Sequence, residues 1–522
     1  MNRDEMLRRV HERADRGERW DLVIIGGGAT GVGIAVDAAS RGHDVVLLEQ
    51  SDFGKGTSSR STKLVHGGVR YLQQGNVPLV MEALKERGIL RQNAPHLVTD
   101  LPFVVPNYRW WEAPFYGVGM RVYDVLAGKY GFGSSRNLSV EETVERIPTI
   151  ETDGLRGGVV YHDGQFDDAR LLVHLAMTAV EQGAVLVNYA RVTGLVRDGS
   201  GFTDGVTVHD VESGREIEVA AKAVVNATGP FTDDVRRMDE PGAPAIIRPS
   251  QGVHVVLDRA FLPGEAAIMV PQTDDGRVLF AIPWHDRVLV GTTDTPVDEV
   301  PLEPRAFEEE VEFLLEHAAR YMTRDPGPPD VLSVFAGIRP LVAEPGEGDT
   351  AEISREHAVR VSESGLLTIA GGKWTTYRKM AEDVVDLAQT LGDLEIRECE
   401  TRRLNIHGFH THAEKYGELA AYGSDAPEVR KILRSGGGFD ERVHPRLDVR
   451  AGEVVWAVRR EMARTVDDVL ARRTRALLLD AAAAREAAPT VARLVADELG
   501  RDPGWVEAQV AAFERIAEGY LL

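Results

Sequence analysis

The segment RSTKLVHGGVRYLQQG, residues 60–75, combines hydroxyl, cationic, imidazole and aromatic side chains with two adjacent glycines. A core element does not need this many polar groups, and a solvated loop does not need the interleaved pairs LV and YL. Adjacent glycines let the main chain come close to another molecule. The segment therefore predicts a wall for a large, flat or charged ligand.

Residues 21–49, DLVIIGGGATGVGIAVDAASRGHDVVLLE, have the spacing of a dinucleotide-binding unit. An apolar run ends in a G-x-G-x-x-G motif, a helical pattern follows, and a second apolar run ends in an acid. We expect Gly26 to allow the tight turn, Gly28 to let the backbone approach a pyrophosphate, and Gly31 to let the helix lie close on the sheet. The helix N-terminus favours phosphate. Glu49 is expected to accept the ribose hydroxyls, and its charge disfavours a 2′-phosphate.

Two further strand-to-glycine turns favour FAD over NAD. The run AAKAVVNATGPFTD reaches Gly229, and GLLTIAGGKWTTYRKMAEDVVDLA reaches Gly372 before an amphipathic helix. Three turns far apart in the chain suit a long molecule that needs contacts at adenine, pyrophosphate and flavin. No histidine or cysteine has a context that demands a covalent flavin link, so we expect noncovalent FAD.

Composition excludes several classes of protein. The 522 residues carry 60 Lys and Arg against 82 Asp and Glu, and this net charge of −22 predicts no nucleic-acid partner. Cys399 is the single cysteine, which excludes an intrachain disulfide or a thiolate metal cluster, and we predict no metal site. No apolar run reaches about 18 residues, and the charged start lacks the apolar centre of a secretory signal. We therefore expect a cytoplasmic protein.

The chain resembles the FAD-dependent glycerol-3-phosphate dehydrogenases of the bacterial respiratory type, within the D-amino-acid-oxidase-like flavoproteins. The resemblance runs from about Asp21 to Leu522. It is carried by the first motif above and by TSSRSTKLVHGGVRYL, VVNATGPF, AIPWHDRVLVGTTDT, FAGIRPL, AGGKWTTYRKMAED and EMARTVDDVLARRTRALLLD.

The resemblance implies which residues hold the cofactor. The segment after Glu49 would wrap the pyrophosphate and pass along the flavin, with two glycines leaving space for the ring. For His66 a structural role and a flavin contact are equally open. The implied cofactor contacts after Glu49 are Thr57, Ser58, Ser61, Thr62, Lys63, Gly67, Gly68, Gly229, Gly372, Lys373 and Thr375.

The resemblance also implies a substrate with a phosphate group and an adjacent secondary alcohol. The planar forks of Arg339 and Arg355 suit phosphate oxygens. Arg70 and Tyr71 follow the paired glycines, where substrate is expected, and Arg70 would steady a developing alkoxide by charge.

His254, in the alternating stretch RPSQGVHVVL, matches the family's active-site histidine and is expected to take the hydroxyl proton while hydride passes to flavin N5. Thr293 and Asp294 are expected either to orient the glycerol hydroxyls or to cap a turn.

The implied reaction converts glycerol 3-phosphate to dihydroxyacetone phosphate and passes the electrons to a quinone. A glycerol-3-phosphate oxidase that makes peroxide, an amine or amino-acid oxidase, and a noncatalytic flavin-binding protein are the alternatives. The aromatic stretch YRWWEAPFYGVGM fits either the core of a cap or a peripheral contact with the inner face of the cell membrane. A homodimer is a further possibility that the sequence leaves open.

The expected fold class is α/β: a Rossmann-type FAD-binding domain with an inserted mixed-sheet substrate cap domain, followed by an all-helical C-terminal domain. Strand-like alternation in GVHVVL, RVLFAI and RVLVGTT marks the cap, and helical periodicity begins near residue 395. The predicted boundaries are 20–105, 155–240 and 335–392 for the discontinuous FAD-binding domain, 106–154 and 241–334 for the cap, and 395–522 for the helical domain.

Overall fold

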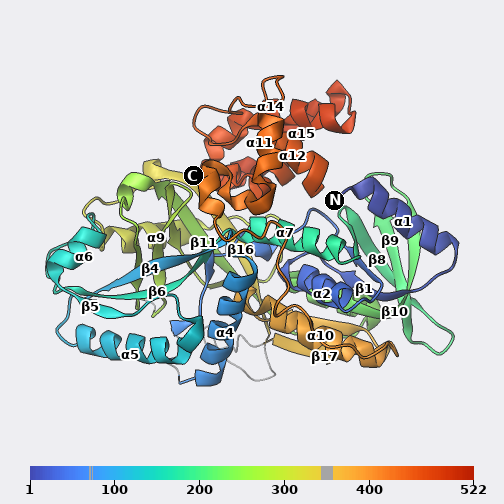
Figure 1. The fold of residues 1–522 in the computed structure, drawn as a ribbon, viewed down its shortest axis with the longest axis horizontal. Coiled ribbons are helices and arrows are strands. Elements are labelled where there is room, and N and C mark those ends of the chain that lie inside the picture. The colour runs from blue at the N-terminus through green and yellow to red at the C-terminus, as the bar shows by residue number, and fades with distance from the viewer. Residues whose placement is uncertain (70–71, 73–74, 275, 343–356) are drawn as a thin grey trace.

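A computed structural model describes residues 1–522 except 70–71, 73–74, 275 and 343–356. The chain forms two sheets that lie side by side, with a group of C-terminal helices across one end of both (Figure 1). The predicted substrate residues Arg70, Tyr71 and Arg355 lie outside the described residues.

The first sheet has eight strands and carries the dinucleotide motif. Its main path is β17-β18-β10-β1-β2-β7, with β8 and β9 attached in antiparallel pairs beside β10. The neighbours β18, β10, β1, β2 and β7 run parallel, and their apolar side chains are buried, as expected for a sheet covered on both faces. Its strands are β1 (Trp20–Ile25), β2 (Val45–Leu48), β7 (Val185–Val187), β8 (Ala190–Arg197), β9 (Thr203–Asp210), β10 (Glu216–Asn226), β17 (His357–Val361) and β18 (Leu367–Gly371).

Helices pack against this sheet. The helix after the glycine motif contacts both the sheet and its neighbouring helices, because its residues are small and apolar. These helices are α1 (Arg3–Asp15), α2 (Ala29–Ser40), α7 (Asp168–Glu181), α8 (Thr232–Asp239) and α10 (Tyr377–Leu391).

The second sheet has ten strands, in the order β15-β11-β14-β13-β12-β4-β6-β3, with β16 beside β11 and β5 beside β6. Its strands are β3 (Leu64–Val65), β4 (Val98–Pro106), β5 (Arg136–Leu138), β6 (Gly158–Phe166), β11 (Ile247–Asp258), β12 (Ala267–Val270), β13 (Leu279–Trp284), β14 (Arg287–Gly291), β15 (Thr295–Pro296) and β16 (Val331–Val342). The helices of this part are α4 (Val77–Asn93), α5 (Glu112–Ala127), α6 (Val140–Arg146) and α9 (Glu308–Ala319).

Membership of this second sheet differs from the predicted division of the chain. Strands β3, β4 and β6, and most of β16, fall in the ranges that the sequence assigns to the FAD-binding domain, yet all four pair within the mixed sheet. The reason is physical: a strand's own side chains predict its alternation and burial, but its sheet is chosen by partners far away in sequence. β4, for example, pairs with β6 from Val98 to Pro106 and with β12 at Phe103 and Val104.

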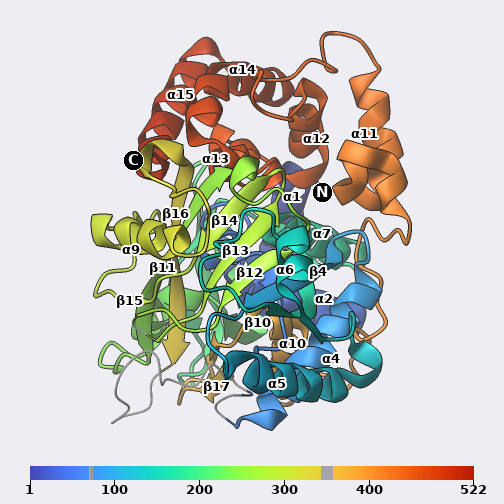
Figure 2. The same ribbon diagram turned by 90° about the vertical axis from the view of Figure 1, so that its left-hand side faces the viewer.

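The C-terminal region is helical, as predicted, and lies over one end of the molecule in both views (Figures 1 and 2). Its helices are η7 (Ala413–Asp425), α11 (Ala426–Leu433), α12 (Ala451–Glu461), the π-helical turn η8 (Asp468–Arg473), α13 (Ala476–Leu479), α14 (Ala481–Leu499) and α15 (Pro503–Ala517). One buried apolar cluster contains Phe103 and Trp284 of the second sheet together with Leu477 and Val491 of these helices. The helical region is therefore packed onto the mixed sheet through a shared core.

Candidate active site

A cavity of about 510 Å³ lies where the two sheets meet. One side is formed by the carboxyl ends of parallel strands, the usual place for a ligand in such a sheet, with Gly26, Glu49, Thr228 and Gly372 among the lining residues. The volume is within the range of ligand-binding pockets. His254 and Arg339 line the other side.

The predicted glycine turn forms the floor of the first side. Gly26 has φ of +107°, and a Cβ there would lie 2.7 Å from the carbonyl oxygen of Ala227. A Cβ on Gly31 would lie 1.9 Å from the Gly26 carbonyl oxygen, so only glycine lets α2 approach the strand this closely. Gly28 caps α2 with no side-chain bond, and Gly28 and Ala29 line the cavity. The start of α2 therefore presents main-chain N–H groups and partial positive charge to this space.

Glu49 lines the cavity and also holds the glycine turn. Its two carboxylate oxygens accept hydrogen bonds from Gly27 N at 2.6 Å and Ser51 N at 2.8 Å. Burial raises the pKa of Glu49, and these two N–H donors act in the opposite direction. Each oxygen keeps a second lone pair, so the carboxylate can still accept from ribose hydroxyls.

Residues 54–62 form a wall of the cavity. Thr57 donates its hydroxyl hydrogen to the Ile338 carbonyl at 2.5 Å, which ties this wall to β16. Ser58 accepts from Ala29 N at 2.9 Å, and Ser61 donates to Asp168 at 2.7 Å. The lining residues here are Gly54, Lys55, Gly56, Thr57, Ser58, Arg60, Ser61 and Thr62.

Lys63 is not among the described residues that line the cavity. Its φ of +63° turns the side chain into the protein, where Nζ contacts Asp168 at 2.7 Å and the Ser59 carbonyl at 2.9 Å. The side chain is fully buried, and burial lowers the pKa of Lys63 to about 7 although Asp168 opposes the shift. The structure thus places this predicted cofactor contact in a buried ion pair behind the wall.

The paired glycines of the opening motif differ from the expectation in a similar way. Gly67 donates from its backbone N to Tyr123 Oη at 2.8 Å, and a Cβ there would meet Leu84 and Tyr123 at 2.5 Å. Gly67 thus allows close packing against α4 and α5. Neither Gly67 nor Gly68 is among the described lining residues, whereas His66 is.

The other predicted turns reach the cavity. Gly229 has φ of +58° and Gly372 has φ of +79°, and both line the cavity with Lys373 and Thr375. The Thr375 hydroxyl accepts from His66 N at 3.3 Å, which joins this turn to the opening motif.

His254 and Arg339 lie on one face of neighbouring antiparallel strands. In the β11–β16 register His254 is opposite Phe335, Gly252 is opposite Gly337, and Ser250 is opposite Arg339. Opposed residues share a face, as do alternate residues along a strand. The glycine pair therefore lies between the imidazole and the guanidinium along the strands, and both glycines line the cavity.

His254 is held tightly. Its ring stacks on Phe335 with centroids 4.9 Å apart, and Nε2 lies 3.0 Å from the Thr62 hydroxyl oxygen. A Cβ on Gly291 would lie 2.1 Å from the ring, so glycine is required beside it. Burial, and then the charges of Lys63 and Arg339, hold the pKa of His254 well below its ordinary value of 6.5. The imidazole is therefore neutral at physiological pH and able to accept a proton.

Arg339 is fixed by several acceptors. Its guanidinium contacts Asp294 at 3.2 Å, the Thr292 hydroxyl at 3.0 Å and the Thr293 carbonyl at 2.9 Å. A Cβ on Gly252 would lie 2.2 Å from Nη2 of Arg339, so glycine makes room for this fork.

Thr293 and Asp294 are buried and are absent from the described cavity lining. The Thr293 hydroxyl accepts from Val253 N at 3.0 Å and donates to Glu310 at 2.9 Å, whereas Asp294 pairs with Arg339. The carbonyl of Thr293 and the carboxylate of Asp294 both contact Arg339, which neither expectation for this turn had included. A role in orienting the glycerol hydroxyls stays a prediction.

Several lining or supporting residues had not been selected from the sequence. Phe335, Gly252 and Gly291 shape the space around the predicted side chains, and Asp168 holds the wall from 105 residues away. Phe335, Gly337 and Arg339 alternate along FAGIR, and Ser250, Gly252 and His254 alternate along SQGVH. That shared period of two was the available signal.

Comparisons with known proteins agree with this geometry. Residues 21–378 match the family described as FAD dependent oxidoreductase, and residues 366–506 match the C-terminal domain of alpha-glycerophosphate oxidase. The mitochondrial glycerol-3-phosphate dehydrogenase of Mesocricetus auratus is 42% identical over 96% of this chain and 73% of its own length. The chain belongs to the family of FAD-dependent glycerol-3-phosphate dehydrogenases. The human relative is 42% identical over 92% of this chain and 71% of its own length.

Solved structures of this family and fold are also similar. The glycerol-3-phosphate dehydrogenase of Bacillus halodurans, complexed with FAD, has a TM-score of 0.81 and 30% identity, covering 99% of this chain and 97% of its own. An L-alpha-glycerophosphate oxidase from Mycoplasma pneumoniae, at 16% identity and a TM-score of 0.58 over 73% of this chain and 97% of its own, shares the fold. These findings confirm the family and the fold class predicted from the sequence.

The cofactor is FAD, and the residues of the cavity fit it. The tight turn at Gly26, which only glycine permits because a Cβ would clash with the Ala227 carbonyl, brings the start of α2 at Gly28 to the cavity, and this suits a pyrophosphate. Glu49 suits a ribose, and two further glycine turns line the same space.

Proposed function

We propose that this enzyme oxidises sn-glycerol 3-phosphate to dihydroxyacetone phosphate and passes the electrons to a quinone. The observation that carries the proposal is the pair of His254 and Arg339, which face the cavity on one side of a strand pair and opposite the dinucleotide cradle. A base and a cationic fork are the two groups that oxidation of a phosphorylated secondary alcohol requires.

In this proposal Arg339 binds the phosphate and His254 takes the hydroxyl proton. The guanidinium is already held by Asp294 and the Thr293 carbonyl, so little side-chain entropy is lost when phosphate binds. Nε2 of His254 accepts the proton, beside the hydroxyl of Thr62. FAD, when bound, supplies the acceptor for the hydride removed from C2. Arg70, Tyr71 and Arg355 remain predicted substrate contacts.

In this proposal the charge of the bound substrate makes His254 a stronger base. The low pKa of His254 arises first from burial and then from Lys63 and Arg339. A bound phosphate dianion offsets the positive charge of Arg339, which raises the pKa of the imidazole toward the working pH. Proton removal is thereby favoured once substrate is in place.

Addition of glycerol 3-phosphate to the FAD-loaded protein without oxygen tests the substrate. We expect bleaching of the flavin band by glycerol 3-phosphate and none by glycerol or by amino acids, because neither group has a phosphate for Arg339. Bleaching by an amino acid would support the amine-oxidase alternative. Absence of bleaching by any of the three would contradict the proposal.

The electron acceptor is tested separately. The match of residues 366–506 to the glycerophosphate-oxidase domain makes oxygen the competing acceptor. We expect the reduced enzyme to be reoxidised quickly by a soluble quinone and slowly by air. Stoichiometric peroxide formed at the rate of turnover would favour the oxidase instead.

We also propose that α5 contacts a membrane surface. Its inner residues Tyr116, Met120 and Tyr123 are buried. The outer side of α5 and the two residues before it carry an exposed apolar stripe, and within the helix spacings of three and four residues keep the side chains on one face. The stripe consists of Trp110, Trp111, Phe115, Val118, Val122 and Val125, with exposed fractions from 38% to 79%.

Neighbouring charges favour an anionic lipid surface for this stripe. Arg109, Arg121 and Lys129 are exposed beside it, and tryptophan prefers the boundary between water and lipid. The helix lies at the end of the molecule opposite the C-terminal helices in both views (Figures 1 and 2). Within the described residues no helix has the length and apolar character needed to span a bilayer. The contact would therefore be peripheral.

A further inference from the structure

The segment EMARTVDDVLARRTRALLLD, residues 461–480, has no part in the proposed chemistry, yet it carries a dense set of buried charges. It contains the π-helical turn η8, in which Thr474 N donates to the Val469 carbonyl at 2.9 Å. Residues five apart are neighbours in a π-turn, and this brings Arg472 to within 2.8 Å of Asp467. Such turns are often found at functional sites.

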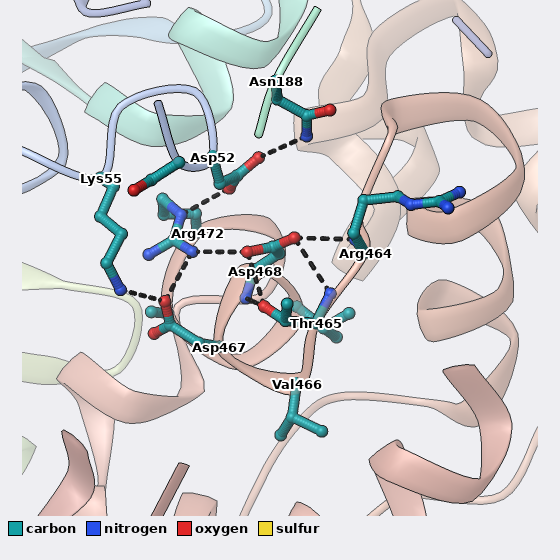
Figure 3. A network of polar contacts seen from close by, with 12 residues as sticks. Asp52, Lys55, Asn188, Arg464, Thr465, Val466, Asp467, Asp468 and Arg472 are labelled. Atoms are coloured by element: carbon teal, nitrogen blue, oxygen red, sulfur yellow. Dashed lines mark hydrogen bonds and ion pairs between the residues drawn. The ribbon is translucent and has the colours of Figure 1, made fainter. Parts of the chain in front are cut away.

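This segment holds the cavity wall through two sets of ion pairs, which we call grips. The first grip joins Asp52 and Lys55 to the segment (Figure 3). Asp52 accepts a hydrogen bond from Nε of Arg472 at 2.5 Å. It also accepts from both terminal nitrogens of Arg473, at 2.7 and 2.8 Å. Asp467 accepts a hydrogen bond from the ammonium of Lys55 at 2.6 Å, and Lys55 lines the cavity. The carboxylate of Asp52 is completely buried, so this contact is not diluted by solvent.

A second grip lies at the other end of the same wall. Arg475 donates to the Ser59 carbonyl at 2.7 Å and to Asp168 at 2.9 Å. Asp168 in turn accepts hydrogen bonds from the backbone N of Ser61 at 3.0 Å and from the ammonium of Lys63 at 2.7 Å. Arg475, like Asp168, is almost completely buried.

The wall residues Gly56, Thr57 and Ser58 lie between these two grips and line the cavity. We propose that residues 467–475 clamp the cofactor loop 52–63, and that Asp467 is a positioning residue for FAD that acts through Lys55. The inference depends on FAD binding and not on the proposed substrate. It gives the C-terminal helical region a role in the site.

The charges of the first grip are balanced. Five carboxylates face five cations in a largely buried cluster: Asp52, Glu303, Glu461, Asp467 and Asp468, with Lys55, Arg60, Arg170, Arg472 and Arg473. Burial lowers the pKa of Lys55, but Asp467 and Glu303 more than offset this and raise it. Loss of one partner leaves an uncompensated buried charge. A loop fixed in this way need not be ordered when FAD binds.

The variant Asp467→Asn tests the clamp because it keeps the shape and removes the charge. In this variant the remaining ion-pair partner of Lys55 is Glu303 of the cap, and loop 52–63 becomes more mobile. We expect the dissociation constant of FAD, measured by titrating the apoprotein and following flavin fluorescence, to rise about tenfold. Hydrogen exchange of the amides of residues 56–62 should become faster, with the remaining amides unchanged.

A matched control and a double-mutant cycle separate this role from general stability. Glu498→Gln removes a more exposed ion pair, with Arg459 at 2.5 Å, elsewhere in the helical region and should leave FAD affinity unchanged. If Asp467 acts through Lys55, Lys55→Met combined with Asp467→Asn should weaken FAD binding no more than Lys55→Met does. Additive losses, or an Asp467→Asn affinity within about twofold of the parent, would overturn the clamp.

A second variant covers the case in which Asp467→Asn does not fold. Nη2 of Arg475 donates to both Ser59 and Asp168, while Nη1 donates to the Ala471 carbonyl of η8. Arg475→Lys keeps the positive charge, but its single nitrogen cannot take both the Nη1 and the Nη2 positions, so the link between η8 and the loop is lost. Weaker FAD binding in this variant supports the clamp, and unchanged binding overturns it. Substrate takes no part in these measurements, so the result is independent of the proposed reaction.

Discussion

The imidazole of His254 is the most constrained titratable group of the site. Phe335 stacks on one face, Thr62 contacts Nε2, and Gly291 leaves the room that the ring occupies. Burial and two nearby cations hold its pKa well below 6.5. A base is active in its deprotonated form, so a depressed pKa extends the active range toward acid.

This gives a prediction for the pH dependence of catalysis. The value of kcat/KM reports groups of the free enzyme and of the free substrate, and the substrate phosphate has a second pKa of about 6. After division by the dianion fraction of the substrate, kcat/KM should stay level as the pH falls through 6.5, the ordinary pKa of histidine. His254→Asn removes the base and should lower kcat by about 100- to 10,000-fold. Steady-state rates with a dye acceptor would measure both. His209→Asn, on β9, is the control and should behave as the parent.

Two results would contradict the assignment of His254. The first is an acid limb centred near pH 6.5 that remains in the parent after the correction for the substrate phosphate and persists in His254→Asn, because another group would then be the base. The second is a kcat in His254→Asn close to that of the His209→Asn control.

At this scale the sequence predicted residue types well and side-chain directions less well. The motifs placed His254, Arg339 and three glycine turns at one cavity, where the structure also has them. Lys63 and Asp294 belong to the same motifs, but their directions depend on a positive φ at Lys63 and on partners such as Asp168 and Arg339. A single sequence shows neither the backbone angle nor the distant partner.

At the scale of single elements, α5 is unusual because both of its faces are apolar. A helix that is apolar all round is normally buried, and an exposed apolar stripe indicates a binding surface. If the stripe contacts lipid, the double variant Trp110→Ser with Phe115→Ser should float with anionic phosphatidylglycerol vesicles about tenfold less than the parent. Each substitution removes apolar side-chain area from the contact. Both side chains are more than half exposed, so the fold should tolerate the change.

The control for this prediction is Phe202→Ser with Ile396→Ser, which removes two exposed apolar side chains away from α5. Equal loss of flotation in both double variants would contradict a specific role for the stripe. A second copy of the chain is the competing occupant. Gel filtration that shows a dimer in the parent and a monomer in the α5 variant, with unchanged flotation, would assign the stripe to the predicted homodimer.

Whole elements were predicted more reliably than their partners. The glycine-motif strands, the helices after them and the helical C-terminal region all appear where the periodicity placed them. β4 and β6 had not been predicted as strands, and they join the mixed sheet because they pair with each other over Val98–Pro106 and Gly158–Phe166. Such pairing is a property of the assembled chain.

At the scale of the molecule, the helical region is attached by charge as well as by apolar packing. The clamp on residues 52–63 is one attachment, and His407 provides another. His407 bridges Glu181, at the end of α7, and Asp425, before α11, at 2.6 Å to each carboxylate. The sequence could not show either attachment, because the partners lie from 18 to more than 400 residues apart.

The His407 bridge predicts a pH-dependent stability. Burial opposes the charge, but Asp425 and Glu181 raise the pKa of His407 from 6.5 to about 9. A raised pKa means that the stabilisation is fully present below 6.5 and is lost as the pH rises through about 9. The Tm of His407→Gln should therefore lie below that of the parent near pH 6, and the difference should largely vanish near pH 10.

The neighbouring histidines do not obscure this measurement. Burial lowers the pKa of His96 to about 4 and holds the pKa of His174 well below 6.5, so both stay neutral throughout that range. His412→Gln, at a site where the side chain is 76% exposed beside Glu414, is the control and should show no such gap. A Tm difference for His407→Gln that is the same at both pH values would mean that shape, and not charge, joins α7 to the helical region.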